Sequence, residues 1–174
     1  MKWFNREYLL KKTDSEFITY IEKTFEDALD ARGIQASTGL LARLVPIIRE
    51  RISTTNELRV MIEEGEFDFF FVDPTPLATS IPGKDSSSTE AQRHLQAVCE
   101  LLSSATNDVF NTSETLKDLL WPYATEHGRG NVLWPLRFTL TGRERSPDPF
   151  IVMSMIGKDA SIRRIEAARV ALTL

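Results

Sequence analysis

Arginine side chains, which can bind phosphate and base edges, are the residues of this chain most suited to a binding function. They are concentrated toward one end of the sequence. Residues 129–174 contain eight Arg or Lys side chains and four Asp or Glu side chains, so this segment has a net charge of +4. The whole chain has a net charge of −4, which leaves −8 on the remainder. A local basic face can attract phosphate even when the whole protein is acidic. The distribution therefore allows nucleic-acid binding, although such charge runs are more commonly a solvated helix surface.

Arrangements of residues that would carry catalysis are missing from the sequence. It contains no glycine-rich phosphate loop, no Ser-His-Asp or Cys-His constellation and no His-Glu-x-x-His motif. One cysteine, Cys99, and two histidines that are far apart, His94 and His127, make a poor zinc site. The acidic residues occur at spacings typical of helix caps and solvated faces. We therefore expect neither a catalytic site nor a metal site in this chain.

The composition is that of a globular protein with one large domain or two small ones. Hydrophobic residues make up 42% of the 174 residues, which suffices for a buried core. No apolar run approaches the roughly 20 residues of a membrane span, and charges interrupt the first residues where a signal peptide needs an apolar stretch. A single cysteine cannot form an internal disulfide and fits a reducing compartment. We expect a cytoplasmic protein with no membrane partner.

Helical periodicity and capping motifs predict an all-α fold that would position the arginines. Residues 13–32 combine a capping box, Thr13 with Glu16, with apolar side chains at helical spacing, and Gly33 ends the pattern. Similar patterns cover residues 38–52, 54–65, 87–102 and 112–127. A proline interrupts two of these patterns, and we expect it to kink or break the helix there. Toward the C-terminus we expect three shorter helices, over residues 135–142, 150–156 and from 159 onward.

A stretch rich in Pro, Ser, Thr and Gly, residues 73–88, predicts a linker or surface loop. The aromatic run before it, residues 67–72, has strand propensity. It has no evident partner strand, so we expect helical or irregular core packing there. The linker divides the chain into two predicted helical subdomains, residues 1–80 and residues 81–174.

Residues 133–166 resemble the C-terminal signature of bacterial-type glutamyl-tRNA synthetases, a family of class I aminoacyl-tRNA synthetases. The matching pieces are Pro135-Leu136-Arg137, Leu140-Thr141-Gly142, Ser146-Pro147, Phe150, Ile156-Gly157-Lys158 and Arg163-Arg164. Residues 2–9 are similar to a W-x-N-x-x-Y segment of that family, and residues 43–58 to a kinked helix that contains Arg49-Glu50-Arg51. The resemblance covers nearly the whole chain and is weakest over residues 66–112.

The resemblance implies an α-helical cage of two subdomains that grips the anticodon loop of tRNA(Glu). It also implies that this chain is a fragment of glutamate-tRNA ligase from which the N-terminal catalytic domain is missing. The ATP-site signatures of the family lie upstream and do not occur here. ATP and Mg would therefore serve the full-length enzyme, and the fragment alone is expected to need no cofactor and to be non-catalytic.

The resemblance implies five anticodon contacts, in a chain that has Asp148-Pro149 where the family often has glycine then leucine. Arg51 matches the position that contacts the last anticodon base, a cytosine, to which a guanidinium offers forked donors. Arg137 matches an arginine that faces the first base or its phosphate. The loop with Ser146 would read the middle base, while Pro147 and Pro149 would provide a rigid apolar edge for stacking. The alternatives are an exposed helix-end arginine at 51, an internal salt bridge at 137 and a plain surface turn at 146–149.

Four further residues are possible RNA contacts, namely Trp134, Arg49, Arg163 and Arg164. Trp134 could stack on a base or pack in the core. The Arg163-Arg164 pair could face phosphates or be structural. Beside the RNA-binding hypothesis stands a helical scaffold that binds protein without RNA, for which an acidic N-terminal part would be typical. Convergence of the anticodon-contact residues on one basic face would favour RNA binding.

Overall fold

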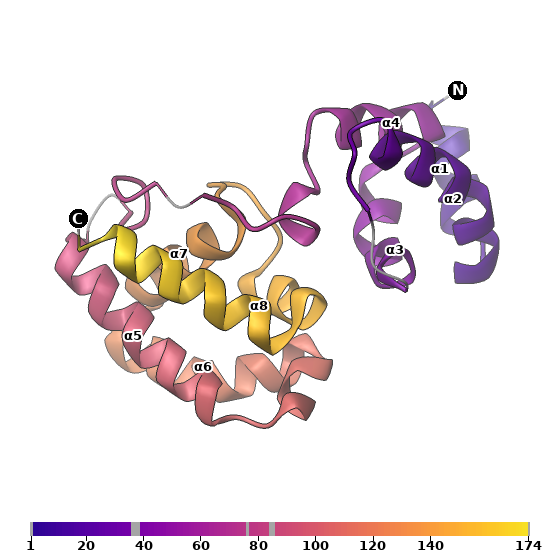
Figure 1. Cartoon of the computed structure of the whole chain (residues 1–174). Helices are drawn as coiled ribbons and strands as arrows, with labels where there is room; N and C mark the ends of the chain where they lie inside the picture. Colours follow the sequence, from indigo (N-terminus) through magenta and orange to yellow (C-terminus); the bar gives the residue numbers. More distant parts are fainter. Residues whose placement is uncertain (1, 36–38, 76, 84–85, 174) are drawn as a thin grey trace. The chain divides into compact units, whose positions relative to one another are not determined.

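The computed structural model describes residues 2–35, 39–75, 77–83 and 86–173. Within these ranges the chain is helical and contains no strand, which confirms the predicted fold class. The chain divides into two compact units, Met1–Phe71 (unit 1) and Val72–Leu174 (unit 2) (Figure 1). The first linker residues thus belong to unit 2, because Asp73 is held by arginines of that unit and Ile81 is fully buried.

Unit 1 contains four α-helices and one 3-10 turn: α1 (Lys2–Leu10), α2 (Asp14–Asp30), α3 (Leu40–Arg51), α4 (Thr55–Glu63) and η1 (Asp68–Phe70). The capping box that starts α2 is present, since Thr13 Oγ1 accepts from the Glu16 N–H and the Glu16 carboxylate accepts from the Thr13 N–H. At α4 the box is shifted, because Glu57 accepts from the N–H of Ser53. The sequence patterns did not reveal α1.

The core of unit 1 lies where α2 packs against α3 and α4. Its fully buried side chains include Phe17, Ile21, Leu44, Ile48, Ile52, Leu58, Ile62 and Phe67. Helix α3 continues through the exposed Pro46 as one element. The aromatic run forms a single 3-10 turn with Phe69 and Phe70 buried, so irregular core packing is confirmed there.

Unit 2 contains α5 (Ser88–Ser104), η2 (Asn107–Asn111), α6 (Ser113–His127), α7 (Arg129–Thr141) and α8 (Pro149–Ala171). Helix α8 packs against α5, α6 and α7, and Figure 1 shows it in yellow alongside α5 and α7. Gly157 interrupts α8 with φ 82° and ψ 179°, which confirms the predicted helix end at that glycine. Helix α7 begins at Arg129, six residues before the predicted start at Pro135. A proline inside the helix removes one backbone donor, and its buried position among Val132 and Leu136 offsets that cost.

The two histidines that are far apart in the sequence are neighbours in unit 2. Their ring centroids lie 5.8 Å apart, because α5 carries His94 past the end of α6, where His127 stands. His94 is buried, and its Nδ1 lies 3.0 Å from the Tyr123 hydroxyl. Cys99 is buried in the same helix, as expected for a packed side chain. Over the described residues, three or more metal-ligating side chains do not cluster, and none of the helices has the length and apolarity to span a membrane.

Candidate nucleic-acid interface

Arg137, on the last turns of α7, is a half-buried arginine without an internal partner. Its Nε atom is shielded from solvent and forms no hydrogen bond. No ion pair or hydrogen bond joins its guanidinium to any residue of the described part of the chain. The internal salt bridge that was the alternative for Arg137 is therefore not found among those residues. A donor that is shielded from water and has no acceptor costs free energy, which a ligand acceptor at Nε would recover.

The backbone around Arg137 is tied to the loop that follows α7. Thr141 is buried, and its hydroxyl oxygen lies 2.8 Å from the carbonyl oxygen of Arg137. The same hydroxyl accepts from the N–H of Arg143 at 3.2 Å. Gly142 takes the left-handed conformation that ends α7, with φ 67°. These contacts hold the loop over residues 143–148 against the helical turn that carries Arg137.

The loop places its two prolines differently. Ser146 and Pro147 are half-buried, and the Ser146 hydroxyl donates to the Pro147 carbonyl at 3.1 Å. Pro149 is buried at the first position of α8, so its ring is not available for stacking. The predicted apolar edge is thereby reduced to Pro147. Asp148 is the N-cap of α8 and accepts from the Phe150 N–H at 2.9 Å, which accounts for an acid at this position.

Trp134 lies one helical turn before Arg137, so the two side chains share a face of α7. Its indole packs on the linker at Gly83, where a Cβ atom would approach Trp134 Cδ1 to 2.7 Å. The indole Nε1 is buried without a partner in the described residues. Trp134 also lines a pocket of about 350 Å³ together with Asn131 and Glu144. The half-buried Trp134 thus packs on the linker and also lines a pocket.

In unit 1, Arg51 is the last residue of α3 and is more exposed than Arg137. Its Nη1 forms an ion pair with Glu66 at 3.1 Å, and both side chains are about one-third exposed, at 37% and 36%. Such an exposed pair contributes little stability and exchanges readily for a ligand acceptor. Arg51 is therefore placed at the surface in a geometry compatible with base contact.

Arg49, one of the possible RNA contacts, is instead used inside unit 1. Its guanidinium donates to the Lys12 carbonyl at 3.0 Å and to the Asp14 carboxylate at 2.8 Å. The guanidinium carbon also lies 4.7 Å from the centroid of the Phe17 ring. With 17% of its side chain exposed, Arg49 ties the start of α2 to α3. The geometry favours this structural role over RNA contact.

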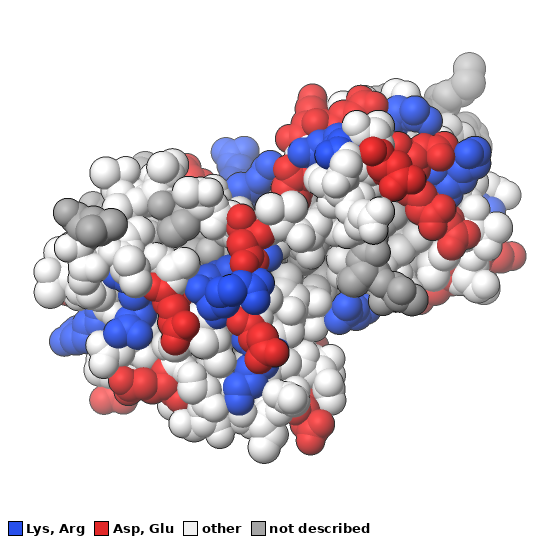
Figure 2. Space-filling model, in the orientation of Figure 1, with Lys and Arg blue, Asp and Glu red and all other residues white. Residues whose placement is uncertain are grey.

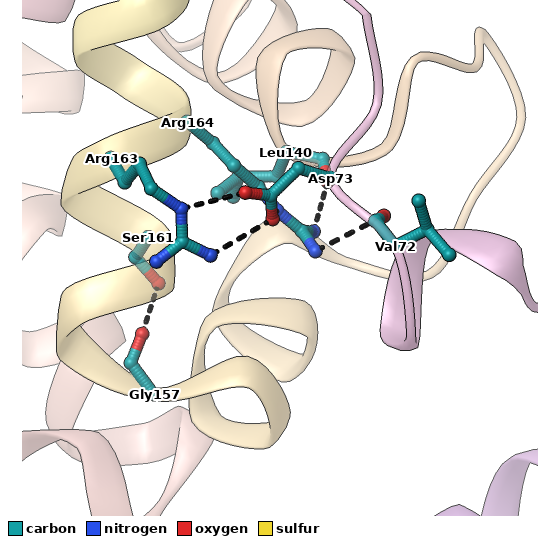
Figure 3. Close-up of polar contacts among 7 residues, drawn as sticks. All are labelled: Val72, Asp73, Leu140, Gly157, Ser161, Arg163 and Arg164. Carbon is teal, nitrogen blue, oxygen red and sulfur yellow. Dashed lines mark hydrogen bonds and ion pairs between the residues drawn. The ribbon is translucent and has the colours of Figure 1, made fainter. Parts of the chain in front are cut away.

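The Arg163-Arg164 pair also has an internal partner, Asp73 of the linker (Figure 3). Arg164 is buried with 4% of its side chain exposed, whereas Arg163 is 60% exposed. The hydrogen bond from Arg163 holds the pKa of the Asp73 carboxyl below its ordinary value, and Arg164 adds to this effect. Burial lowers the pKa of Arg164 and Asp73 opposes that shift. Of the two predicted roles for this pair, the structure favours the structural one.

Charges of both signs are interspersed over the face drawn in Figure 2, on each unit taken by itself. Two arginines of the basic C-terminal segment, Arg163 and Arg164, form ion pairs with one acid, Asp73. The net charge of +4 in residues 129–174 therefore overstates the positive field there. Arg137 is one of the arginines of this segment that form no ion pair with a described acid.

The chain matches the model of a family described as anticodon binding domain over residues 12–169. The chain belongs to this family of anticodon-binding domains. The match runs through both units and includes α7, the loop after it and α3, where the candidate contacts lie. The family favours the RNA-binding hypothesis over the protein-binding scaffold.

The relatives of this anticodon-binding domain are glutamate–tRNA ligases. It is 32% identical to that of Flavobacterium psychrophilum over 96% of the chain and 29% identical to that of Flavobacterium johnsoniae over 98%. The solved structure of a glutamate tRNA ligase from Elizabethkingia meningosepticum, in complex with its amino acid, is similar with a TM-score of 0.74 at 26% identity, over 98% of the chain. In all three cases the chain spans about a third of the relative's length, 31% or 32%.

Two residues of the anticodon-binding domain contribute to the candidate interface although the sequence patterns did not single them out. Gly83 lets the linker pack on Trp134, and Asp73 engages the arginine pair. Each acts across a long sequence separation or through a backbone contact, so local patterns could not reveal it. Whether Arg51 and Arg137 share one basic face remains a prediction, because each unit is described by itself.

Proposed function

We propose that this anticodon-binding domain recognises the anticodon of tRNA(Glu) and forms the C-terminal part of a glutamate–tRNA ligase. The observation that carries the proposal is the half-buried side chain of Arg137, whose Nε is shielded from solvent and whose guanidinium has no acceptor within the described residues. A nucleotide offers base carbonyl, ring nitrogen and phosphate acceptors, which a planar fork of donors binds well. The family and its ligase relatives supply the kind of nucleic acid.

The residue roles in this proposal follow the surroundings of each side chain. Arg137 contacts the first anticodon base or its phosphate, and the loop of Ser146 and Pro147 contacts the middle base. Arg51 leaves Glu66 to contact the last base, a cytosine. Trp134, one helical turn before Arg137, lines a pocket in which a base can stack on the part of the indole that the linker leaves free. Base-edge contacts of this kind carry sequence specificity, whereas phosphate contacts only position the RNA.

The proposal also concerns the rest of the ligase. Attachment of glutamate to tRNA with ATP and Mg is assigned to the part of the enzyme that lies outside this chain, in the cytoplasm. The domain would act by selecting the tRNA and holding its anticodon.

A comparison of two RNAs tests the proposal. The chain is titrated with tRNA(Glu) and with the same tRNA carrying a different anticodon, in a filter-binding assay at fixed salt. Tighter binding of the first RNA is expected, by about 5-fold or more if a single base-edge contact is worth about 1–3 kcal/mol. Equal binding of the two RNAs would contradict anticodon recognition by this chain.

A further inference from the structure

Asp73 is held by two adjacent arginines of α8 in unit 2 (Figure 3). Arg163 Nε donates to Asp73 Oδ2 at 2.6 Å and its Nη2 donates to Oδ1 at 3.1 Å. Arg164 Nε donates to Asp73 Oδ1 at 2.8 Å. Both oxygens of the carboxylate are thus engaged. We call Asp73, Arg163 and Arg164 the linker clamp.

The linker clamp also reaches the end of α7. Arg164 Nη1 donates to the Leu140 carbonyl at 2.7 Å, and Nη2 donates to the Val72 carbonyl at 3.3 Å. Leu140 is in the last turn of α7, where carbonyl groups lack a helical partner and a cation is favourable. Pro74 packs on the glycine that ends the helix, since a Cβ atom at Gly142 would lie 3.0 Å from Pro74 Cβ. Residues 72–74 are therefore fastened to the end of the helix that carries Arg137.

The position of the clamp in the chain matters because unit 1 ends at Phe71. With the clamp closed, about two residue steps separate Phe71, the last residue of unit 1, from Asp73, the residue that the arginines hold. With the clamp open, the next firmly packed residue is Ile81, which is fully buried. Residues 72–80 would then act as a free tether.

We infer that the linker clamp is a positioning device that keeps the tether between the two RNA-contacting units short, so that one tRNA engages both units at once. This inference rests on the proposed function, since it requires contacts from Arg51 in unit 1 and Arg137 in unit 2. Asp73, Arg163 and Arg164 then act on RNA binding without touching RNA.

The size of the effect follows from the tether length. The effective concentration of the second unit falls roughly as the −3/2 power of the number of free residues. Lengthening the tether from about two to about nine residues lowers it by about tenfold. Opening the clamp should therefore weaken tRNA binding by up to about tenfold, and all tRNA sequences should be affected alike.

The substitution Asp73→Asn distinguishes this positioning role from phosphate contact, because the two roles predict opposite changes in tRNA affinity. If Arg163 and Arg164 bound phosphate, removing the acid that competes for them would strengthen binding. If the clamp positions the units, Asp73→Asn weakens binding and leaves the salt dependence unchanged, because no phosphate contact is lost. Asp118→Asn is the matched control, since Asp118 is an exposed acid of the same unit with no partner in the described residues.

The experiment measures fluorescence anisotropy of labelled tRNA(Glu) with the full chain, and amide hydrogen exchange of residues 72–80 without RNA. The expected result is faster exchange in this segment and weaker binding for Asp73→Asn, with little change for Asp118→Asn. Arg163→Gln should show the same changes to a smaller extent, because Arg164 keeps its bond to Asp73. This variant also serves as the test if Asp73→Asn lowers the folded fraction seen by circular dichroism.

Two results would overturn the inference. One is unchanged exchange of residues 72–80, which would mean that the clamp does not hold the linker. The other is faster exchange with unchanged or tighter tRNA binding, provided that Arg137→Gln weakens binding in the same assay. If Arg137→Gln also leaves tRNA binding unchanged, the proposed function fails, and the inference fails with it.

Discussion

Replacement of Arg137 by glutamine tests the binding role of this residue. It also tests whether the missing internal acceptors mean that Arg137 contributes nothing to the stability of the fold. The change removes the charge and the fork of donors but keeps one amide donor. A good base contact is worth about 1–3 kcal/mol, so binding of tRNA(Glu) should weaken by about 5- to 150-fold. Anisotropy titrations of labelled tRNA(Glu) at one salt concentration would measure this change.

Arg137→Gln should affect the stability of the chain in the opposite way from replacement of an ordinary buried arginine, which lowers the free energy of unfolding. No hydrogen bond or ion pair to a described residue is lost, and a partly desolvated charge disappears. The free energy of unfolding should therefore change by less than about 0.5 kcal/mol or rise. Arg164→Gln is the contrast, because it removes hydrogen bonds to Asp73, Leu140 and Val72 and should cost about 3 kcal/mol. Urea unfolding followed by circular dichroism would measure both variants.

A third variant at the same position distinguishes a base from a phosphate. Arg137→Lys keeps the charge and loses the fork, so it should bind nearly normally if the ligand is a phosphate and poorly if it is a base edge. The reasoning is refuted if Arg137→Gln destabilises the chain by more than about 1.5 kcal/mol, the usual loss for a charged hydrogen bond inside a fold. Unchanged tRNA binding would refute the binding role.

Three further predictions concern other parts of the chain. Arg51→Gln should weaken the binding free energy by about 1–3 kcal/mol for tRNA(Glu) and by less for tRNA(Gln), so the rates at which the full enzyme charges the two tRNAs should become more alike. An equal loss for both tRNAs would show that Arg51 does not contact a base edge. Burial lowers the pKa of His94 below its ordinary 6.5, with contributions from Arg93 and His127. The contribution of neutral His94 to the free energy of unfolding should therefore be fully present above about pH 6.5 and fall as the pH drops toward the folded-state pKa. His94→Gln should flatten this pH dependence in urea unfolding. Phe17→Ala should cost about 3–5 kcal/mol in the same assay, because Phe17 is fully buried and supports Arg49; a loss below about 1 kcal/mol would contradict its place in the core.

The sequence predicts the helices well where their signals are local. Thr13 with Glu16 and Ser87 with Glu90 form the expected capping boxes, and Gly142 and Gly157 end helical segments with positive φ angles. Each of these features depends on a few neighbouring residues, so it can be recognised without the rest of the chain. Pro135 misled the prediction of α7, because a buried proline is tolerated inside a helix when packing offsets the lost hydrogen bond.

The candidate contacts illustrate what local patterns leave undecided. Arg49, Arg51, Arg137 and Arg164 are equivalent in charge and all lie in segments that resemble the ligase family. Their roles differ because Arg49 and Arg164 have internal acceptors, Arg51 has an exposed partner and Arg137 has none in the described residues. The partners of Arg49 and Arg164 lie 35 and 91 residues away, Asp14 and Asp73.

By itself, then, the sequence determined the all-α class, most helix ends and the family resemblance, since periodicity, caps and motifs are written in neighbouring residues. Only the tertiary structure decided which arginines are available to a ligand, that Pro149 is buried and that His94 meets His127. Burial and pairing depend on which distant segments pack together. The free energy of a charged side chain is set by those neighbours rather than by its position in the chain.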